Sequence, residues 1–368
     1  MSKTALHYQF YGQRCDAPSV QNFLDHLLGS QLRTPVCIWG RHGIGKTELV
    51  AQIAKAKGMA FRDIAPAQFE EMGDLLGLPQ LKEVDGKSIT QFAPPEWVPR
   101  EDVPGILLID DVNRADDRIL RGIMQLLQNH ALVSWALPPQ WRIVLTANPD
   151  GGDYSVTPMD DAMLTRMMHI TLEFDPKAWA WWAQQAGIDS RGIDFVLIYP
   201  ELVSGARTTP RSLVQFFKSI EGIADLKAEL SLVHQLAQSC LDEATSAAFV
   251  TFVRQNLSAL VSAETIVSAK DFDKQVLPAI TRSVGKDTPR IDVLATLCTR
   301  LCHYLKQNPK SLKGTGLTNV QRFLKMELLP HDLRLGLMQD LMQSGDPALK
   351  AVLADVELAQ QFLSVSIA

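Results

Sequence analysis

Eight consecutive residues in the first part of the chain have the types and spacing of a phosphate-binding loop. They follow the pattern G-x-x-x-x-G-K-[ST], with a short apolar run before them and helical spacing after them. Glycines let main-chain N–H groups turn toward a phosphate, and the N-terminus of the following helix adds a partial positive charge. The residues are Gly40, Arg41, His42, Gly43, Ile44, Gly45, Lys46 and Thr47.

The polar side chains of this loop have separate expected roles. Lys46 is expected to reach the β- and γ-phosphates of a nucleotide, and Thr47 to ligate Mg²⁺. His42 occupies a variable position of the pattern, so no catalytic role is expected for it. The loop therefore predicts binding of ATP together with Mg²⁺.

Two adjacent carboxylates, Asp110 and Asp111, end a second apolar run at residues 106–109. A buried strand delivers such side chains to the carboxyl edge of a sheet. Asp110 is expected to hold Mg²⁺ through water, and Asp111, which points in another direction, to orient or deprotonate the attacking water. A helix cap is the alternative role for this pair, and the phosphate loop upstream favours the catalytic interpretation.

The elements that must position these residues alternate between buried strands and helices. Strands are expected at residues 35–39, 59–64, 106–110, 141–148 and 168–174, with helical patterns between most of them. This alternation predicts an α/β fold whose parallel sheet is covered by helices on both faces.

A long insertion at residues 65–104 separates the second and third expected strands. Asp85-Gly86 predicts a hairpin turn within it, and several prolines predict irregular chain. Loops of this length are usually functional or mobile. Residues 132–137 fit a second short hairpin and an ordinary helix-to-strand connection equally well.

The pattern becomes helical after Asp175-Pro176, which has the form of a helix N-cap followed by proline. The tryptophans at 179, 181 and 182 are interpreted as core residues, because aromatic clusters at helical spacing are usually packed inside. The expected organisation is an N-terminal linker (1–34), an α/β nucleotide-binding domain (35–175), a helical lid (176–256) and a C-terminal helical domain (257–368).

Composition limits the partners and the compartment. The net charge is −5, so the chain lacks the overall basic field that drives nonspecific nucleic-acid binding. No apolar run approaches the length of about 20 residues that a bilayer span needs. The five cysteines form no C-x-x-C pair and the N-terminus has no signal-peptide pattern, so a cytoplasmic protein is expected.

The motifs occur in the order found in MoxR-type AAA+ ATPases. Residues 110–115, Asp-Asp-Val-Asn-Arg-Ala, resemble the acidic-acidic-x-Asn-Arg-Ala signature of that family. Residues 146–149 resemble its sensor 1, residues 159–166 its arginine-finger segment, and residues 209–211 the start of its lid helix with the sensor 2 arginine. The insertion, with Gly-Asp-Leu-Leu-Gly at 73–77, resembles the helix 2 insert. The resemblance covers about two-thirds of the chain.

The resemblance implies an AAA+ P-loop sheet flanked by helices, an all-α lid and a further helical region. Asn148 would then bond the γ-phosphate or the attacking water, Arg166 would act in trans on the nucleotide of a neighbouring subunit, and Arg211 would be the sensor 2 arginine. It also implies an Mg²⁺-dependent ATPase that forms a homo-oligomeric ring, a hexamer in this family. Such a ring remodels a partner protein, often one with a von Willebrand factor A domain.

Two other functions stay open. Related AAA+ rings move or load nucleic acid, although the acidic composition argues against this function here. A nucleotide-gated switch that assembles with ATP and hardly hydrolyses it is the second alternative. It rests on Asp111, because most members of the family have glutamate at this position and aspartate is shorter by one methylene.

Overall fold

The computed structural model describes residues 11–149, 156–204, 207–255, 257, 260–285 and 289–360. The chain divides into two compact units, residues 1–178 and 179–368. Among the described helices, none combines the length and apolar character that crossing a membrane requires.

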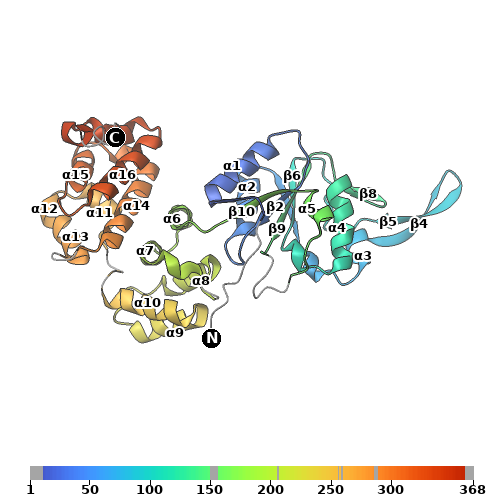
Figure 1. Cartoon of the computed structure of the whole chain (residues 1–368), viewed down its shortest axis with the longest axis horizontal. Coiled ribbons are helices and arrows are strands. Elements are labelled where there is room, and N and C mark those ends of the chain that lie inside the picture. Colours follow the sequence, from blue (N-terminus) through green and yellow to red (C-terminus); the bar gives the residue numbers. More distant parts are fainter. Residues whose placement is uncertain are drawn as a thin grey trace. The chain divides into compact units, whose positions relative to one another are not determined.

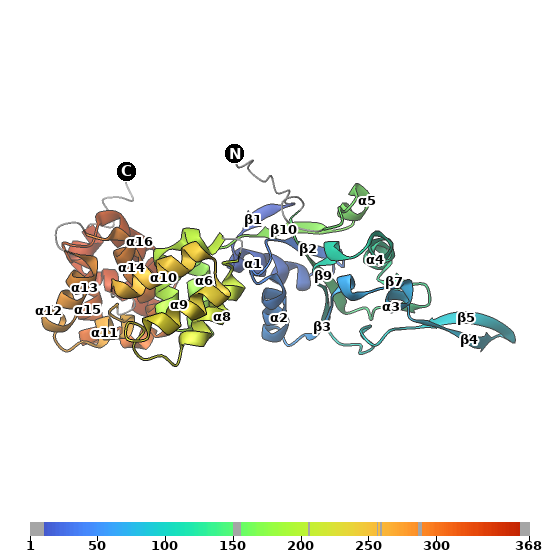
Figure 2. The same cartoon turned by 90° about the horizontal axis from the view of Figure 1, so that it is seen from below.

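The first unit is built on a six-stranded parallel sheet (Figures 1 and 2). Its strand order is β1-β10-β2-β9-β6-β3, and every neighbouring pair is parallel. The main elements are β1 (Gln13–Cys15), α1 (Ala17–Leu28), β2 (Val36–Trp39), α2 (Lys46–Ala56), β3 (Ala60–Ile64), α3 (Met72–Leu76), β4 (Leu78–Val84), β5 (Lys87–Ala93), β6 (Gly105–Ile109), α4 (Asp117–Asn129), β9 (Trp141–Ala147), α5 (Asp161–Leu164) and β10 (Met168–Leu172). Shorter elements are the 3-10 turns η1 (Pro66–Gln68) and η2 (Val112–Arg114) and the strands β7 (Ala131–Leu132) and β8 (Trp135–Ala136). The predicted parallel sheet with helices on both faces is confirmed.

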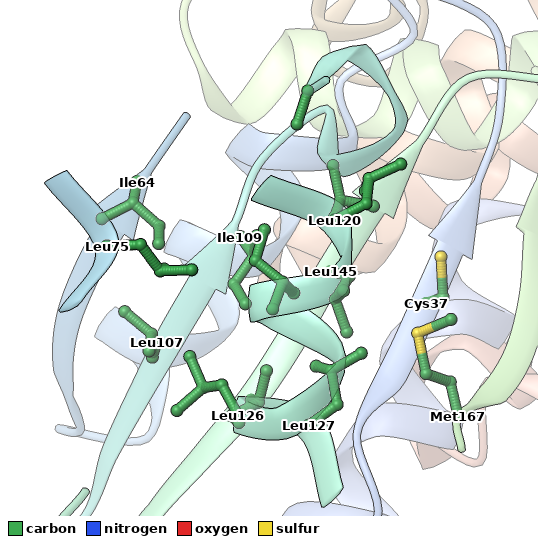
Figure 3. Close-up of a cluster of buried hydrophobic side chains, with 14 of the residues drawn as sticks. Cys37, Ile64, Leu75, Leu107, Ile109, Leu120, Leu126, Leu127, Leu145 and Met167 are labelled. Carbon is green, nitrogen blue, oxygen red and sulfur yellow. The ribbon is translucent and has the colours of Figure 1, made fainter. Parts of the chain in front are cut away.

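Side chains point alternately to the two faces of the sheet along each central strand, and this explains why the unit has two hydrophobic cores. Val36 and Ile38 of β2 pack with residues of α1 and α2, whereas Cys37 and Trp39 pack with α3 and α4 on the opposite face. The strands β6 and β9 alternate in the same way, because successive side chains of a strand point to opposite faces. Figure 3 shows the core that Cys37 shares with α3 and α4, with α4 lying over the sheet. Burial on both faces explains why these strands read as continuous apolar runs.

The insertion at residues 65–104 contains the predicted hairpin. β4 and β5 pair antiparallel around Asp85 and Gly86, whose φ angles are 52° and 71°. These positive values match the mirror-image turn that suits the twist of two paired strands. The hairpin is largely exposed, and Leu81 on it has 81% of its surface open to solvent. The second short hairpin, β7 with β8, is also present.

The N-terminal region differs from the linker expected at residues 1–34. β1 pairs with β10 at the edge of the sheet, and α1 buries Val20 and Leu24 in one of the two cores. The aspartate Asp16 caps α1 by accepting a bond from the main-chain N–H of Ser19. The α/β unit therefore begins before residue 35.

The second unit is helical throughout its described residues. Its elements, counted from α6 at the junction of the units, are α6 (Pro176–Gln185), α7 (Ser190–Ile198), η3 (Pro200–Ser204), α8 (Pro210–Ile220), α9 (Leu230–Cys240), α10 (Glu243–Arg254), α11 (Ala263–Ser268), α12 (Phe272–Gln275), α13 (Leu277–Val284), α14 (Ile291–Gln307), η5 (Pro309–Ser311), α15 (Thr315–Leu324), α16 (His331–Gln343), α17 (Pro347–Lys350) and η6 (Ala351–Ala354). Trp179 is buried and lies 6.3 Å, centroid to centroid, from the ring of Phe217. The division of this unit near residue 256 into a lid and a C-terminal domain stays a prediction.

Candidate functional site

The phosphate-loop sequence connects β2 to α2, at the carboxyl edge of the sheet. Gly43 and Gly45 have φ angles of 67° and 103°, which side-chain-bearing residues rarely adopt. A Cβ atom on Gly40 would lie 2.9 Å from the carbonyl oxygen of Leu172 in β10. The glycines therefore shape this turn, and α2 begins immediately after it with its N-terminus toward the loop.

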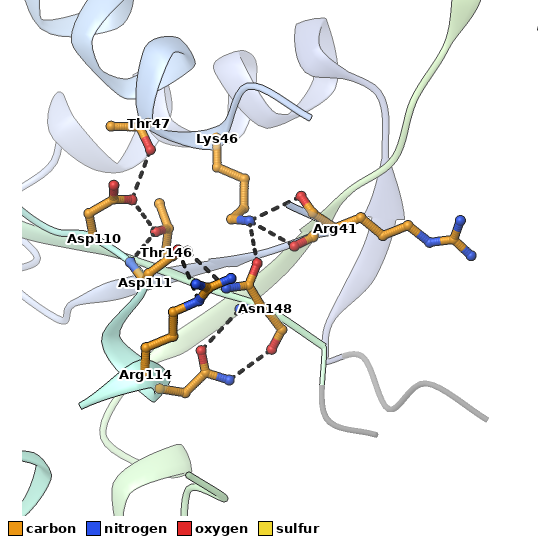
Figure 4. A network of polar contacts seen from close by, with 10 residues as sticks. Arg41, Lys46, Thr47, Asp110, Asp111, Arg114, Thr146 and Asn148 are labelled. Atoms are coloured by element: carbon orange, nitrogen blue, oxygen red, sulfur yellow. Dashed lines mark hydrogen bonds and ion pairs between the residues drawn. The ribbon is translucent and has the colours of Figure 1, made fainter. Parts of the chain in front are cut away.

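Lys46 lies buried under this loop, with 5% of its surface exposed. Its Nζ donates to the carbonyl oxygens of Gly40 (2.8 Å) and Arg41 (3.2 Å), and to Oδ1 of Asn148 (3.1 Å). Burial lowers the pKa of Lys46 to about 8, although the carboxylate of Asp111 acts in the opposite direction. Figure 4 shows the side chain of Arg41 pointing away from this cluster.

Asp110 forms the second part of the site. Its Oδ1 accepts hydrogen bonds from the hydroxyls of Thr47 (2.8 Å) and Thr146 (2.5 Å). The parallel register that pairs Ile109 with Leu145 explains this arrangement, because it places Asp110 beside Thr146 at the ends of β6 and β9. The carboxyl edge of the sheet thus collects one carboxylate and two hydroxyl groups.

A hydroxyl and a carboxylate at this spacing fit an Mg²⁺ ion. Among the described residues, no group of three or more His, Cys, Asp or Glu side chains is placed to hold a metal. Mg²⁺ does not need such a group, because it takes one or two protein oxygens and completes its shell with water and phosphate oxygens. Thr47 and Asp110 would supply the protein oxygens, and the ion would supply positive charge beside the phosphates.

Asp111 follows in a different backbone conformation and faces other partners. Its φ of 47° and ψ of 46° are left-handed, a region that aspartate tolerates better than most residues. The main-chain N–H of Asp111 donates to Oγ1 of Thr146 (2.8 Å), and its Oδ1 accepts from Nδ2 of Asn148 (3.0 Å). Its Oδ2 lies 3.4 Å from Nε of Arg114. The carboxylates of Asp110 and Asp111 therefore bond different partners.

Asn148 connects the two halves of the site. It is fully buried, its Oδ1 accepts from Lys46, and its Nδ2 donates to Asp111. The structure therefore brings together residues that are about one hundred positions apart in the sequence, in a network that Figure 4 shows. The amide of Asn148 lies between the ammonium group of Lys46 and the carboxylate of Asp111. Its oxygen therefore faces a positive charge and its N–H group faces a negative charge.

Two residues of this network received no individual role from the sequence. Thr146 is fully buried and contacts both aspartates. Asn113 is also fully buried and bonds the main chain of Asn148. Both lie inside motifs that the sequence singled out, but their partners are more than thirty positions away, so local pattern does not reveal them.

Arg166 lies apart from this network. It follows α5, its Nε donates to Oε1 of Gln128 on α4 (3.2 Å), and another of its N–H groups bonds the carbonyl oxygen of Ala162. The strand that follows includes His169, which accepts a bond from Nε1 of Trp39 at the end of β2 (3.0 Å). The finger role of Arg166 stays a prediction.

Arg211 belongs to the second unit. It is exposed in the first turn of α8, after Thr209, which caps the helix through a reciprocal pair of bonds with Ser212. The expected helix start at residues 209–211 is confirmed. The sensor role of Arg211 stays a prediction.

One comparison with known families covers the stretch of chain that carries these residues. Residues 35–167 match the family described as the AAA domain of the dynein-related subfamily. The matched range begins one residue before β2 and ends one residue before β10, so it includes the phosphate loop, both aspartates and Asn148.

Solved structures also align with the chain at low identity. An ATPase candidate from Cytophaga hutchinsonii is 14% identical over 77% of this chain and 74% of that one, with a TM-score of 0.33. The RuvB Holliday junction branch migration motor of Thermotoga maritima is 15% identical over 72% of this chain and 87% of that one, with a TM-score of 0.38. Alignments with such values carry nothing about function.

Proposed function

We propose that this protein is an Mg²⁺-dependent ATPase of the MoxR type. In this proposal it assembles as a homo-oligomeric ring, a hexamer by resemblance, and uses ATP turnover to remodel or activate a partner protein. A partner with a von Willebrand factor A domain follows from the same resemblance.

The observation that carries the ATPase proposal is the position of Asn148 between Lys46 and Asp111. A lysine under a phosphate loop holds the γ-phosphate end of a nucleotide, and a carboxylate nearby can orient the attacking water. Asn148 contacts both groups, so one amide lies where it can bond the phosphate and the water together. Asp110 and Thr47, which are bonded to each other, would provide oxygens for Mg²⁺.

One observation favours the alternative of a nucleotide-gated switch. Asp111 is bonded by Asn148 and lies near Arg114, so in this structure its short carboxylate is engaged by two neighbours. If these contacts persist with ATP bound, the carboxylate would not reach the water. Nucleotide would then drive assembly with little turnover.

Replacing Asp111 by asparagine distinguishes the two functions. As an ATPase, the Asp111→Asn variant should bind ATP normally and lose about 100- to 10,000-fold in turnover, because an amide cannot accept the proton of water. Phosphate release and ATP binding measured on the same preparation test this expectation. The variant should also keep the partner bound, because it is arrested with ATP.

Asp85→Asn is the matched control for this change. Asp85 is exposed, lies in the hairpin turn and has a left-handed φ of 52°, close to that of Asp111. The control removes the same charge from the same backbone conformation, so it should hydrolyse ATP like the parent. Equal turnover in Asp111→Asn and the parent would refute the water-activating role, and a parent that binds ATP without turnover would favour the switch.

A further inference from the structure

Asn113 is a buried amide whose side chain bonds the main chain of a single residue. Its Nδ2 donates to the carbonyl oxygen of Asn148 (2.8 Å), and its Oδ1 accepts from the main-chain N–H of the same residue (3.1 Å). Asn113 lies in the 3-10 turn η2 and has no exposed surface. A side-chain amide has the same donor and acceptor as a peptide group, so this pair resembles one rung of a strand ladder.

The two bonds between Asn113 and Asn148 lie just beyond the end of the strand pairing. The pairing of β2 with β9 ends at Trp39 and Ala147, one residue before Asn148. The other neighbour of β9 is β6, whose pairing with β9 ends at Ile109 and Leu145, and Asn113 in the turn after β6 bonds Asn148 beyond that end. The main chain of Asn148 is thereby held at the position from which its amide reaches Lys46 and Asp111.

The turn that carries Asn113 is itself anchored. The carbonyl oxygen of Asn113 accepts from the main-chain N–H of Thr157 (2.7 Å), and the hydroxyl of Thr157 donates to the carbonyl oxygen of Ala115 (2.7 Å). Asp111 is two residues before Asn113 in the same segment. The contacts of Asn113 therefore connect the segment that carries the carboxylate with the residue whose amide bonds that carboxylate.

We propose that Asn113 is a positioning residue for ATP hydrolysis, which sets the main chain of Asn148 so that its amide faces Asp111 and the attacking water. This role rests on the proposed ATPase function. Asn113 touches neither nucleotide nor water in this role and acts through Asn148. Removing it should reduce turnover more than ATP binding, because Lys46 keeps its bonds to the carbonyl oxygens of Gly40 and Arg41, which do not involve Asn113. A displacement of about 1 Å at a reacting group can cost about 100-fold in rate.

Two substitutions in the full chain test the proposal. Asn113→Asp keeps an oxygen for the N–H of Asn148 but places a second oxygen against its carbonyl, so turnover should fall about 10- to 100-fold while the Kd for ATP changes less than about threefold. A buried carboxyl that faces a carbonyl has a raised pKa, and its protonated form can donate the missing bond. Turnover of Asn113→Asp relative to the parent should therefore recover as the pH falls. Asn129→Asp, at an exposed position at the end of α4, is the matched control.

A double-mutant cycle separates positioning from a general loss of structure. Asn113→Ala should reduce turnover in the parent and have little further effect in an Asn148→Ala background, because the group it positions is then absent. Additive losses would overturn the positioning role, and so would parental turnover in both Asn113 variants. A parent that binds ATP without hydrolysing it would overturn the proposed ATPase function and the positioning role together. If Asn113→Asp does not fold, the cycle with Asn113→Ala decides the question.

Discussion

The Lys46 ammonium group is bonded by three oxygens of the protein itself. Two of them belong to the loop that would receive the phosphates, and the third belongs to Asn148. ATP would therefore enter a site whose lysine is held in place by protein oxygens. The loop carbonyls keep the ammonium group buried, and this burial is the reason for its lowered pKa.

This lowered pKa predicts that ATP binding weakens in mildly alkaline solution. Burial lowers the pKa of Lys46 to about 8, and phosphates beside it would raise that pKa. Below pH 8 the charged form that binds phosphate is already present. Above pH 8 binding must take up a proton, so the Kd for ATP should rise about tenfold per pH unit until the pKa of the bound state is reached.

Binding measured between pH 7 and pH 10 tests this expectation, with Lys46→Arg as the comparison. Arginine stays charged over the whole range, so its affinity should be weaker because of its shape but independent of pH. A parent whose Kd is constant up to pH 10 would show that Lys46 is not the group that titrates.

At the residue scale, local sequence patterns located the parts of the site but not the bonds that assemble it. The phosphate loop and the two aspartates each lie within one short motif, so residue type and spacing were sufficient to find them. Thr146 and Asn113 act through partners 36 and 35 positions away, and such pairing depends on which strands are neighbours in the sheet. The roles of the predicted site residues stay predictions.

At the element scale, the hairpin of β4 and β5 offers a test of steric fit at its base. A Cβ atom on Gly77 would lie 1.7 Å from the carbonyl oxygen of Ala93, and the φ of Gly77 is 93°. Gly86 at the hairpin tip also has a positive φ, 71°, but nothing lies within 4 Å of a Cβ atom there. Gly77 differs from Gly86 in this collision, and its ψ of −173° also places it in a backbone region that is essentially restricted to glycine.

Gly86→Ala should therefore cost about 1 kcal/mol of stability, from the left-handed backbone alone. Gly77→Ala should cost about 2 to 4 kcal/mol, because the collision at the base of the hairpin is added. Chemical unfolding followed by tryptophan fluorescence measures both, since Trp97 and Trp135 bond main-chain oxygens of α3 beside this base. Similar losses in the two variants would contradict the close contact at Gly77.

Elements with a strong local signal were predicted, and those that depend on distant partners were not. The central strands are buried on both faces, so each of them appears in the sequence as a continuous apolar run. The pair Asp85-Gly86 predicted the turn of the hairpin. β1 has three residues, none of them fully buried, and its partner β10 lies about 155 residues later, so no local pattern reveals it. Helix α1 has a local signal in the sequence, the N-cap Asp16 followed by Pro18 at the second helical position. The expectation of a linker at residues 1–34 did not take this signal into account.

At the scale of the whole molecule, the ring proposal predicts that nucleotide drives assembly. Nucleotide bound between two subunits stabilises their association by linkage. Sedimentation with a non-hydrolysable ATP analogue should therefore show a large particle that is absent without nucleotide. A parent that stays monomeric at every protein and nucleotide concentration would contradict the ring.

Arg166→Ala tests the same proposal from the interface side. The variant should bind ATP nearly as the parent does and lose about 1,000-fold or more in turnover, because the finger stabilises charge that develops in the transition state. Mixing it with Lys46→Ala should restore part of the ATPase activity. The Lys46→Ala subunit supplies the arginine finger, and the Arg166→Ala subunit supplies an intact phosphate loop. Arg118→Ala, which removes an exposed arginine of α4, is the control.

The exposed hairpin also has a consequence for how the molecule behaves when it is concentrated. β4 and β5 form a sheet of two strands, so each of them has an open edge. Open edges with apolar side chains favour pairing between molecules, and lysines on the edge oppose it. Here the lysines are Lys82 and Lys87, and the apolar side chains include Leu81. Salt screens the repulsion between lysines and strengthens apolar association. Raising the ionic strength should therefore increase the self-association of this protein in concentrated solution.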